Sequence, residues 1–363
     1  MSKKNHLFLY TLLLATLGAT SSLAPNMPPM DLSSRRHTSN FSARKNHPAS
    51  YEDSPKFLGP LILPKTKSTS DNRTRIKHFY AEASNDYDLT SILEKAAPLK
   101  PLQPSACTDL ILKTITDHFA MRDAPVDAKE MAESMEFYLR TKKRLMAAAK
   151  KRHAKNLRLS KEQHSNSKDD KNELDQSKAI VEVYDICSGH GLTGMLFAAC
   201  NPPRQDRIVK TYLVDIVQPP SHQVLKELIA EVCPWVNDNV QFLTSDLDSF
   251  DPMTMSNTDT DTNKNTQDVC SIVIATHACG TLTDKVLEQA VKMECCAIAA
   301  MPCCYTGTDK GVPYGIKRAH GVAWAADIKR TYFLDSHNFH TDYSTIPLEI
   351  TPLNRIIVAE DRS

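Results

Sequence analysis

The stretch Asp185-Ile186-Cys187-Ser188-Gly189-His190-Gly191-Leu192-Thr193-Gly194 decides the fold of this 363-residue chain. The chain has only ten glycines, and three of them fall within six residues of this stretch. An apolar run at 181–186 predicts a buried strand before the loop, and the run at 194–200 predicts a helix after it. Because a glycine-rich turn between a strand and a helix is typical of nucleotide-binding α/β folds, we expect the chemistry to lie here.

Strands and helices alternate downstream of this loop. Apolar runs predict strands at 208–214, 240–243, 270–276 and 297–301, helices after Ser221 and at 283–293 and 316–334, and β-like runs at 343–350 and 355–359. Such alternation implies a parallel sheet with helices on both faces. We therefore predict an α/β fold with a Rossmann-like sheet over residues 179–363, carrying a polar surface insertion at 253–268.

The part upstream of the sheet has a different texture. Apolar residues at helical spacing predict helices at 107–119 and at about 127–157. The second helix has these apolar residues on one side: Met131, Met135, Tyr138, Leu139, Leu145 and Met146. We interpret residues 81–158 as an α-helical extension and the polar residues 159–178 as a linker.

The first 80 residues resemble a targeting leader. Lys3 and Lys4 precede an apolar run at 7–17 and then small residues, so 1–22 is typical of a signal peptide. Residues 23–80 begin rich in Arg and Ser and poor in acids, as a disordered transit segment does. Together they resemble the bipartite leader of algal complex plastids, although Leu23-Ala24-Pro25 stands where Phe-Ala-Pro is common. We expect an organellar, plastid location; the secretory pathway and the cytoplasm are the alternatives.

The charge of the chain gives one local signal. The formal net charge is +1, which removes any whole-protein argument for nucleic-acid binding. Residues 140–158, however, hold nine Lys or Arg and no acid. This face could contact RNA phosphates or be an ordinary solvated helix face. The candidate RNA contacts are Arg140, Lys142, Lys143, Arg144, Lys150, Lys151 and Arg152.

Two cofactors compete for the glycine loop. Gly189 to Gly194 matches the G-x-G-x-x-G pattern, and Asp215 lies 21 residues further on, where a dinucleotide fold places its ribose-binding acid. The acid Asp185 at the strand end would, however, repel a pyrophosphate. It suits a ligand with an ammonium group, and S-adenosylmethionine has one. The alternative is an NAD(P)-dependent oxidoreductase.

Further motifs make the chain similar to one family. Residues 185–191 resemble motif I of class I methyltransferases, with Cys-Ser in place of the first glycine. His277-Ala278-Cys279-Gly280-Thr281-Leu282-Thr283-Asp284 and Pro302-Cys303-Cys304-Tyr305 resemble two signatures of a methyltransferase-domain family. That family includes methyltransferase-like proteins and is related to the tRNA 2′-O-methyltransferase of the acceptor stem. Residues 349–355 look like its closing hairpin. The resemblance covers about 181–360 and implies S-adenosylmethionine as cofactor.

The expected site lies at the carboxyl ends of the strands, where open parallel sheets bind ligands. Asp185 would hold the methionine moiety, Asp215 the ribose and Asp246 the adenine amino group, with the loop completed by Cys187, Ser188, Gly189, His190 and Gly191. Either Asp215 or Asp246 could instead be an exposed N-cap. His277 is the candidate proton acceptor, unless it only supports the following turn. The residues expected to line the substrate are Cys279, Pro302, Cys303, Cys304 and Tyr305.

The ten cysteines predict neither a disulfide framework nor a metal centre. Most lie in apolar runs of a chain large enough to fold without crosslinks, so we expect reduced thiols. A zinc site from Cys295, Cys296, Cys303 and Cys304 is disfavoured because adjacent residues of a strand point to opposite faces. We therefore expect no metal.

Together these features predict an S-adenosylmethionine-dependent methyltransferase with an unidentified acceptor, for which RNA is the first candidate. A non-catalytic binding module of the same fold is a third alternative. The deciding observation is whether the chain binds S-adenosylhomocysteine or NADH.

Overall fold

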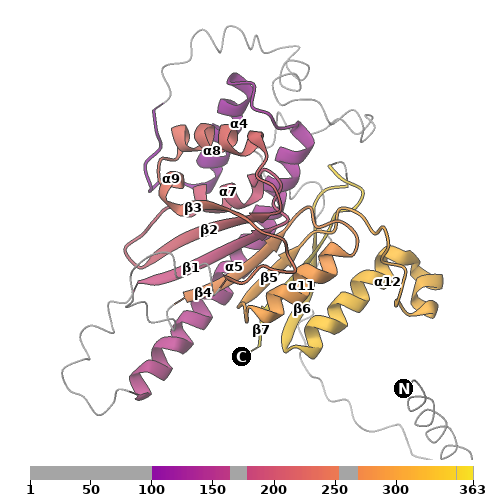
Figure 1. Ribbon diagram of the computed structural model, residues 1–363. Helices are drawn as coiled ribbons and strands as arrows, with labels where there is room; N and C mark the ends of the chain where they lie inside the picture. Colours follow the sequence, from indigo (N-terminus) through magenta and orange to yellow (C-terminus); the bar gives the residue numbers. More distant parts are fainter. Residues whose placement is uncertain (1–99, 164–177, 253–268, 349, 363) are drawn as a thin grey trace, which may run out of the picture. The chain divides into compact units, whose positions relative to one another are not determined.

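The computed structural model describes residues 100–163, 178–252, 269–348 and 350–362. The predicted leader, the 253–268 insertion and most of the linker lie outside these ranges. In the described part, the elements alternate as the sequence predicts (Figure 1). The helices are α4 Thr108–Met121, α5 Ala128–Gln163, α7 Leu192–Ala199, α8 Pro220–Val232, α9 Val236–Asn239, α11 Leu282–Lys292 and α12 Tyr314–Ser336. The strands are β1 Ala179–Ile186, β2 Arg207–Asp215, β3 Val240–Thr244, β4 Val269–Ala275, β5 Ala297–Ala300, β6 Phe339–Thr345 and β7 Arg355–Asp361.

These strands form one sheet in the order β3-β2-β1-β4-β5-β7-β6. Strands β1 to β5 are parallel, whereas β7 is antiparallel to β5 and β6 is antiparallel to β7. The strand order reverses between β1 and β4, which makes the carboxyl ends of these two strands the switch point where ligands bind. The α/β fold and the Rossmann-like sheet are confirmed. Strands β6 and β7 form an antiparallel pair, but β6 covers Phe339–Thr345 and not the predicted 343–350.

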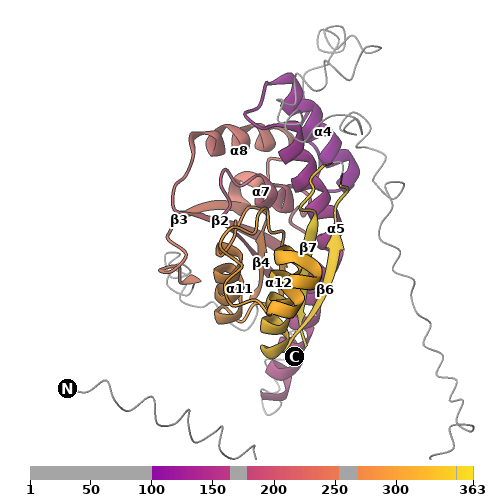
Figure 2. The same cartoon turned by 90° about the vertical axis from the view of Figure 1, so that its right-hand side faces the viewer.

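Alternating side chains of the strands feed two hydrophobic cores. Val181 and Val183 of β1 point to a core that α4, α5, α7 and α8 complete, whereas Tyr184 and Ile186 point to a second core with α11 and α12. Helices therefore cover both faces of the sheet (Figures 1 and 2). The helices upstream of the sheet share the first of these cores with it.

Two helix boundaries differ from the prediction. Helix α5 continues to Gln163, past the boundary at 158, because residues 159–163 contain no glycine or proline that would end it. Helix α8 begins at Pro220 with Pro219 as its N-cap, so Ser221 lies inside the first turn and does not cap the helix. Proline is favoured at this first position because its missing N–H would have no partner there.

No helix in the described ranges is both long and apolar enough to cross a bilayer. Helix α5 has the length, but lysines and arginines run along it.

Candidate active site

The glycine loop joins β1 to α7 at the switch point. Gly191 caps α7 with φ 83°, and a Cβ there would lie 2.3 Å from Leu213 Cδ1. Gly194, in the first turn, faces the same side chain: its Cβ would lie 2.4 Å from Leu213 Cδ2. Glycine is therefore required at both positions, at Gly191 for conformation and space and at Gly194 for space.

Asp185 lies beneath the loop and is 1% exposed. Its Oδ2 accepts a hydrogen bond from the Gly194 N–H at 2.9 Å, while Oδ1 is buried without a partner among the described residues. Burial raises the pKa of Asp185 to about 7; the bond from Gly194 opposes this rise, and the negative charge of Asp215 adds to it. A buried carboxylate oxygen without a partner fits a cationic ligand group such as an ammonium.

Asp215 faces the loop from the end of β2. Its Oδ2 accepts from the Gly189 N–H and its Oδ1 from the Ile216 N–H, both at 2.8 Å. These two bonds fix the carboxylate and leave one lone pair on each oxygen for the hydroxyls of a ribose. Ser188 is buried, and its Oγ has no hydrogen-bond partner in the described part of the chain; burial raises the pKa of the Cys187 thiol to about 11. The loop thus offers a fixed acid, a free hydroxyl and a neutral thiol.

Asp246 is exposed in the turn after β3. Its Oδ1 accepts from the Asp248 N–H at 2.9 Å, so one oxygen closes its own turn and the other faces solvent. Asp246 is thus exposed and bonds its own backbone turn, as in the alternative where this acid has a local structural role. Its contact with adenine stays a prediction.

His190 makes a contact that the sequence did not predict. Its Nε2 lies 2.6 Å from Glu130 Oε1, in the first turn of α5. Burial alone would raise the pKa of Glu130, but the hydrogen bond with His190 and the charges of His190, His277 and Lys129 lower it overall. The His190 imidazole thus contacts α5, and its backbone carbonyl lies 3.0 Å from His222 Nδ1; its contact with a cofactor stays a prediction.

Helix α5 also reaches the site through hydroxyls. Thr193 Oγ1 lies 3.0 Å from Ser134 Oγ of α5 and 3.2 Å from Thr276 Oγ1 at the end of β4. All three side chains are buried. These hydroxyl contacts connect α5, α7 and the end of β4 directly beside His277, which is half-buried. The only sequence signal for Glu130 and Ser134 was their place on the first, acid-containing part of a long helix.

The HACG and PCCY motifs pack against each other. The Gly280 N–H donates to Cys304 O at 3.2 Å, and a Cβ on Gly280 would lie 2.3 Å from Thr306 O. A disulfide joins Cys279 to Cys303, with Cα atoms 5.5 Å apart. The expectation of reduced thiols throughout is therefore wrong, because the fold brings loops 24 residues apart into contact.

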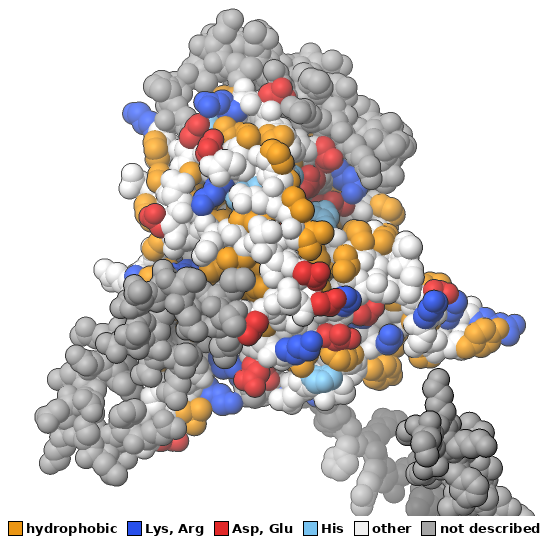
Figure 3. Space-filling view, viewed as in Figure 1, with side chains coloured by type: hydrophobic (Ala, Val, Ile, Leu, Met, Phe, Trp, Pro, Cys, Tyr) orange, Lys and Arg blue, Asp and Glu red, His pale blue; other side chains and the backbone are white. Residues whose placement is uncertain are grey.

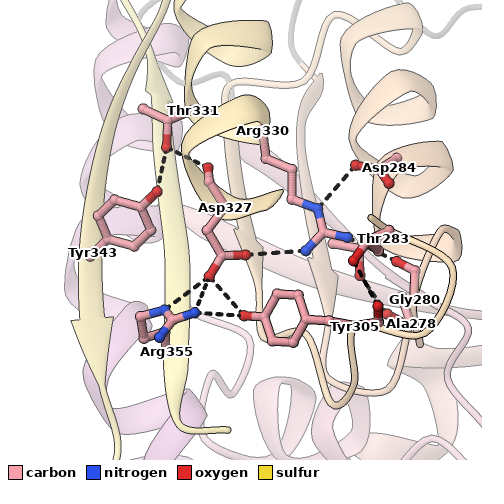
Figure 4. A network of polar contacts seen from close by, with 11 residues as sticks. Ala278, Gly280, Thr283, Asp284, Tyr305, Asp327, Arg330, Thr331, Tyr343 and Arg355 are labelled. Atoms are coloured by element: carbon pink, nitrogen blue, oxygen red, sulfur yellow. Dashed lines mark hydrogen bonds and ion pairs between the residues drawn. The ribbon is translucent and has the colours of Figure 1, made fainter. Parts of the chain in front are cut away.

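Tyr305 belongs to a polar network under these loops (Figure 4). Its hydroxyl donates to Asp327 Oδ2 at 2.7 Å and accepts from Arg355 Nη2 at 3.1 Å. Arg330, 1% exposed, bonds Asp327, Asp284 and the Gly280 carbonyl. Burial and the Asp327 charge raise the pKa of Tyr305. Tyr305 therefore helps to position the motif loops, and its substrate-lining role stays a prediction.

The three arginines among the candidate RNA contacts of α5 are engaged in ion pairs. Arg140 bonds Glu136 at 2.8 Å, Arg144 bonds Glu360 at 2.7 Å and Asp342 at 3.0 Å, and Arg152 pairs with Asp361. Lys142 lies over the Tyr138 ring, 5.2 Å from its centroid. Lys143, Lys150 and Lys151 are exposed.

These pairs also place the stretch away from the site. Glu360 lies opposite Ala297, the first residue of β5, so it marks the amino edge of the parallel strands. Glu130 lies at the carboxyl edge, and the 20 residues to Lys150 span about 30 Å at ~1.5 Å per residue. The predicted RNA face is therefore smaller and more distant from the site than the sequence indicated.

Comparison with known proteins gives one family model and several solved structures. Residues 140–310 match a family model described as a methyltransferase domain. No curated protein gives a significant match. Among solved structures, the chain is similar to an rRNA methylase from Streptococcus thermophilus at 11% identity, with a TM-score of 0.30, covering 52% of this chain and 91% of the other. The Methanococcus jannaschii fibrillarin pre-rRNA processing protein gives 13% identity, a TM-score of 0.31 and coverages of 51% and 68%.

A 16S rRNA (adenine(1408)-N(1))-methyltransferase from Catenulisporales acidiphilia gives 11% identity, a TM-score of 0.31 and coverages of 52% and 89%. The matched segment of the family model contains the glycine loop, Asp215, His277 and both cysteine motifs. This favours the methyltransferase over the oxidoreductase that shares the loop pattern. Residues 140–310 thus contain a methyltransferase domain, and the protein is a methyltransferase whose fold implies S-adenosylmethionine as the methyl donor.

Proposed function

We propose that the edge formed by Asp185, the glycine loop and Asp215 binds S-adenosylmethionine. The observation that carries this proposal is the buried Asp185 oxygen without a partner among the described residues, beneath a loop in which a Cβ on Gly189 would meet nothing within 4 Å. Asp185 holds the ammonium group, Asp215 accepts from the ribose hydroxyls, and Asp246 receives the adenine amino group. Bound there, the cofactor supplies an electrophilic methyl group.

His277 is the proposed proton acceptor. It follows β4 at the switch point, half-buried, beside the Thr193–Thr276 contact and within the electrostatic reach of Glu130. The imidazole there accepts the proton that an acceptor hydroxyl or amine loses as the methyl group arrives. Glu130 stabilises the resulting positive charge.

RNA is the proposed acceptor, and the surface that supports it is the first half of α12. This helix ends next to β6, at the amino edge, and Arg330 in its second segment reaches Gly280 at the carboxyl edge. The helix is kinked at Gly321 (φ 82°), and its first segment lies beyond this kink. Tyr314 is 75% exposed there, with Lys310 and Arg318 also exposed. Figure 3 shows Lys and Arg side chains at this projecting tip, together with hydrophobic side chains and an acidic one. Cations beside an aromatic ring suit phosphates and an unstacked base.

Two experiments test the activity. Titration with S-adenosylhomocysteine and with NADH should give micromolar binding of the first and none of the second; the reverse result would overturn the cofactor proposal. Labelled methyl from S-adenosylmethionine should then enter fractionated total extract in a form that ribonuclease removes. Label that resists ribonuclease and disappears with protease would show a protein acceptor instead.

We also propose import into a plastid through residues 1–80. The support is the sequence order alone: a basic start, an apolar run, then an Arg- and Ser-rich segment. A fusion of residues 1–80 to a fluorescent protein should colocalise with plastids, and a uniform cytosolic signal would contradict the proposal.

A further inference from the structure

Three cysteine sulfurs converge at the carboxyl edge of the sheet. The Sγ atoms of Cys279, Cys303 and Cys304 all lie within 4.8 Å of one another, and Cys279 and Cys303 are joined in the disulfide. Cys279 is exposed and the other two are half-buried, so a solute can reach the cluster. Cys303 Sγ lies 3.8 Å from the His277 carbonyl oxygen, which places the cluster beside the proposed proton acceptor.

The fold removes the objection that the sequence raised against a metal at the Cys303–Cys304 pair. Adjacent residues point to opposite faces only within a strand, and β5 ends at Ala300. Cys303 and Cys304 lie in the bend after it, which turns both sulfurs toward Cys279. Cys295 and Cys296, by contrast, precede Ala297 at the other end of β5, so the four-cysteine site considered from the sequence is wrong.

The spacing of the sulfurs suits a thiophilic metal ion. Zn²⁺ binds thiolates at about 2.3 Å, so the sulfurs of a tetrahedral site lie roughly 3.8 Å apart. Opening the disulfide lets Cys279 and Cys303 move apart toward this spacing, with Cys304 already nearby. Three protein thiolates leave one coordination position open to solvent, since Cys279 is exposed.

We propose that Cys279, Cys303 and Cys304 form a zinc site in the reduced protein, in redox exchange with the Cys279–Cys303 disulfide. A thiol reductant such as glutathione transfers two electrons: two reductant thiols are oxidised to a disulfide, and the protein disulfide becomes two thiols. Zinc then displaces the three thiol protons. This site is independent of the cofactor and acceptor proposals.

Both forms crosslink the same two loops. Gly280 contacts Cys304 and Thr306 through the backbone, and Arg330 bonds the Gly280 carbonyl from below. A disulfide or a zinc ion therefore completes a junction that the backbone already holds close, at the edge where the methyl acceptor would lie. Zinc binding therefore needs no large movement of the two loops, because their backbones are already in contact.

The test is zinc content of the full chain. Protein reduced with a thiol reagent, loaded with zinc and desalted should hold about one zinc per chain by mass spectrometry, and cobalt in its place should give thiolate charge-transfer absorption. Cys279→Ser and Cys304→Ser should each lower the zinc content at least about fivefold, while Cys107→Ser, which removes an exposed cysteine outside the cluster, should not. Protein kept oxidised should bind none.

A second measurement needs no variant. In the reduced wild-type chain, zinc should protect the peptides containing these three cysteines from alkylation and leave Cys107 reactive. A reduced chain without bound zinc, or zinc that stays in Cys279→Ser and Cys304→Ser, would overturn the proposal. So would alkylation of the three cysteines at the same rate with and without zinc.

Discussion

Glu130 Oε1 lies 2.6 Å from His190 Nε2, and this carboxylate–imidazole contact joins the first turn of α5 to the middle of the glycine loop. Asp127 caps the same turn, with its Oδ1 accepting from the Glu130 N–H at 2.6 Å. An acid in the first turn is favoured by the helix dipole, so α5 holds Glu130 in place without help from the sheet. The shape of the cofactor loop therefore depends on a helix that precedes the α/β alternation.

Glu130→Gln should weaken S-adenosylhomocysteine binding by about three- to tenfold, because the pair is partly buried and its loss frees His190. The matched control is Glu231→Gln, which removes another carboxylate–histidine contact, 2.8 Å to His118, between α4 and α8. Calorimetric titration of both variants measures the difference. Equal affinity in Glu130→Gln and wild type would show that this contact does not shape the loop.

Gly194→Ala should lower the free energy of unfolding by about 1–3 kcal/mol, because the new methyl overlaps the buried side chain of Leu213. Gly315→Ala is the control: nothing lies within 4 Å of a Cβ there, and the residue is in α12. The control should be neutral or stabilising by up to ~1 kcal/mol. Thermal denaturation measures both, and a Gly194→Ala variant as stable as Gly315→Ala would contradict the packing argument.

The order of the elements was predictable because each strand and helix has its own apolar pattern. Asp185 and Asp215 were predictable as site residues for the same reason: they stand where strands end, and the ends of parallel strands meet at one edge. These inferences need only local sequence and the rules of α/β topology.

Contacts between distant segments were not predictable in this way. Nothing in the residues near Glu130 indicates His190 as its partner, because the pairing depends on how α5 lies across the sheet. The same holds for Arg144, which looked like an RNA contact until Glu360 and Asp342 were placed beside it. Cys279 and Cys303 likewise meet only because β4 and β5 are neighbours.

Affinity for S-adenosylhomocysteine should rise as the pH rises through about 7. The pKa of Asp185 is raised to about 7 by burial, so below that pH the carboxyl is largely neutral and does not attract an ammonium group. In Asp185→Asn, which keeps an oxygen for the Gly194 N–H, the affinity should be lower and should lose this pH dependence. A wild-type affinity that is flat from about pH 6 to 8 would contradict the assigned role of Asp185.

The Asp185 carboxyl should also make the free energy of unfolding depend on pH, but this free energy should fall as the pH rises. Because the folded pKa lies above the ordinary value of 3.8, the folded protein binds the extra proton between these values. The contribution of Asp185 to the free energy of unfolding is therefore complete below about pH 4 and is lost as the pH rises through about 7. Denaturant unfolding of wild type and Asp185→Asn should show their stability difference shifting against the wild type over this range.

Tyr305→Phe should lower the free energy of unfolding by about 1–3 kcal/mol, because it removes the hydroxyl that Asp327 and Arg355 share. Asp327 is 0% exposed, so water does not readily replace the lost donor. Tyr332→Phe is the control, since Tyr332 is 68% exposed. Denaturant unfolding of the two variants measures the effect. Equal stability of the two variants would show that the Tyr305 hydroxyl does not stabilise the fold.

The last prediction separates the two basic surfaces as RNA contacts. Lys310→Gln combined with Arg318→Gln removes exposed cations next to the carboxyl edge, whereas Lys150→Gln combined with Lys151→Gln removes exposed cations of α5 near the amino edge. The first pair should raise the KM for RNA by about three- to tenfold and reduce the salt slope of binding by about 1–2, since each lost phosphate contact removes close to one counterion. The second pair should change both quantities less, because an acceptor at the site must extend about 30 Å to meet those lysines. Affinity for S-adenosylhomocysteine should be unchanged in both double variants, which shows that the folds are intact. A larger change in KM and salt slope from the α5 pair would show that RNA binds along α5. No change from either pair would argue for an acceptor other than RNA.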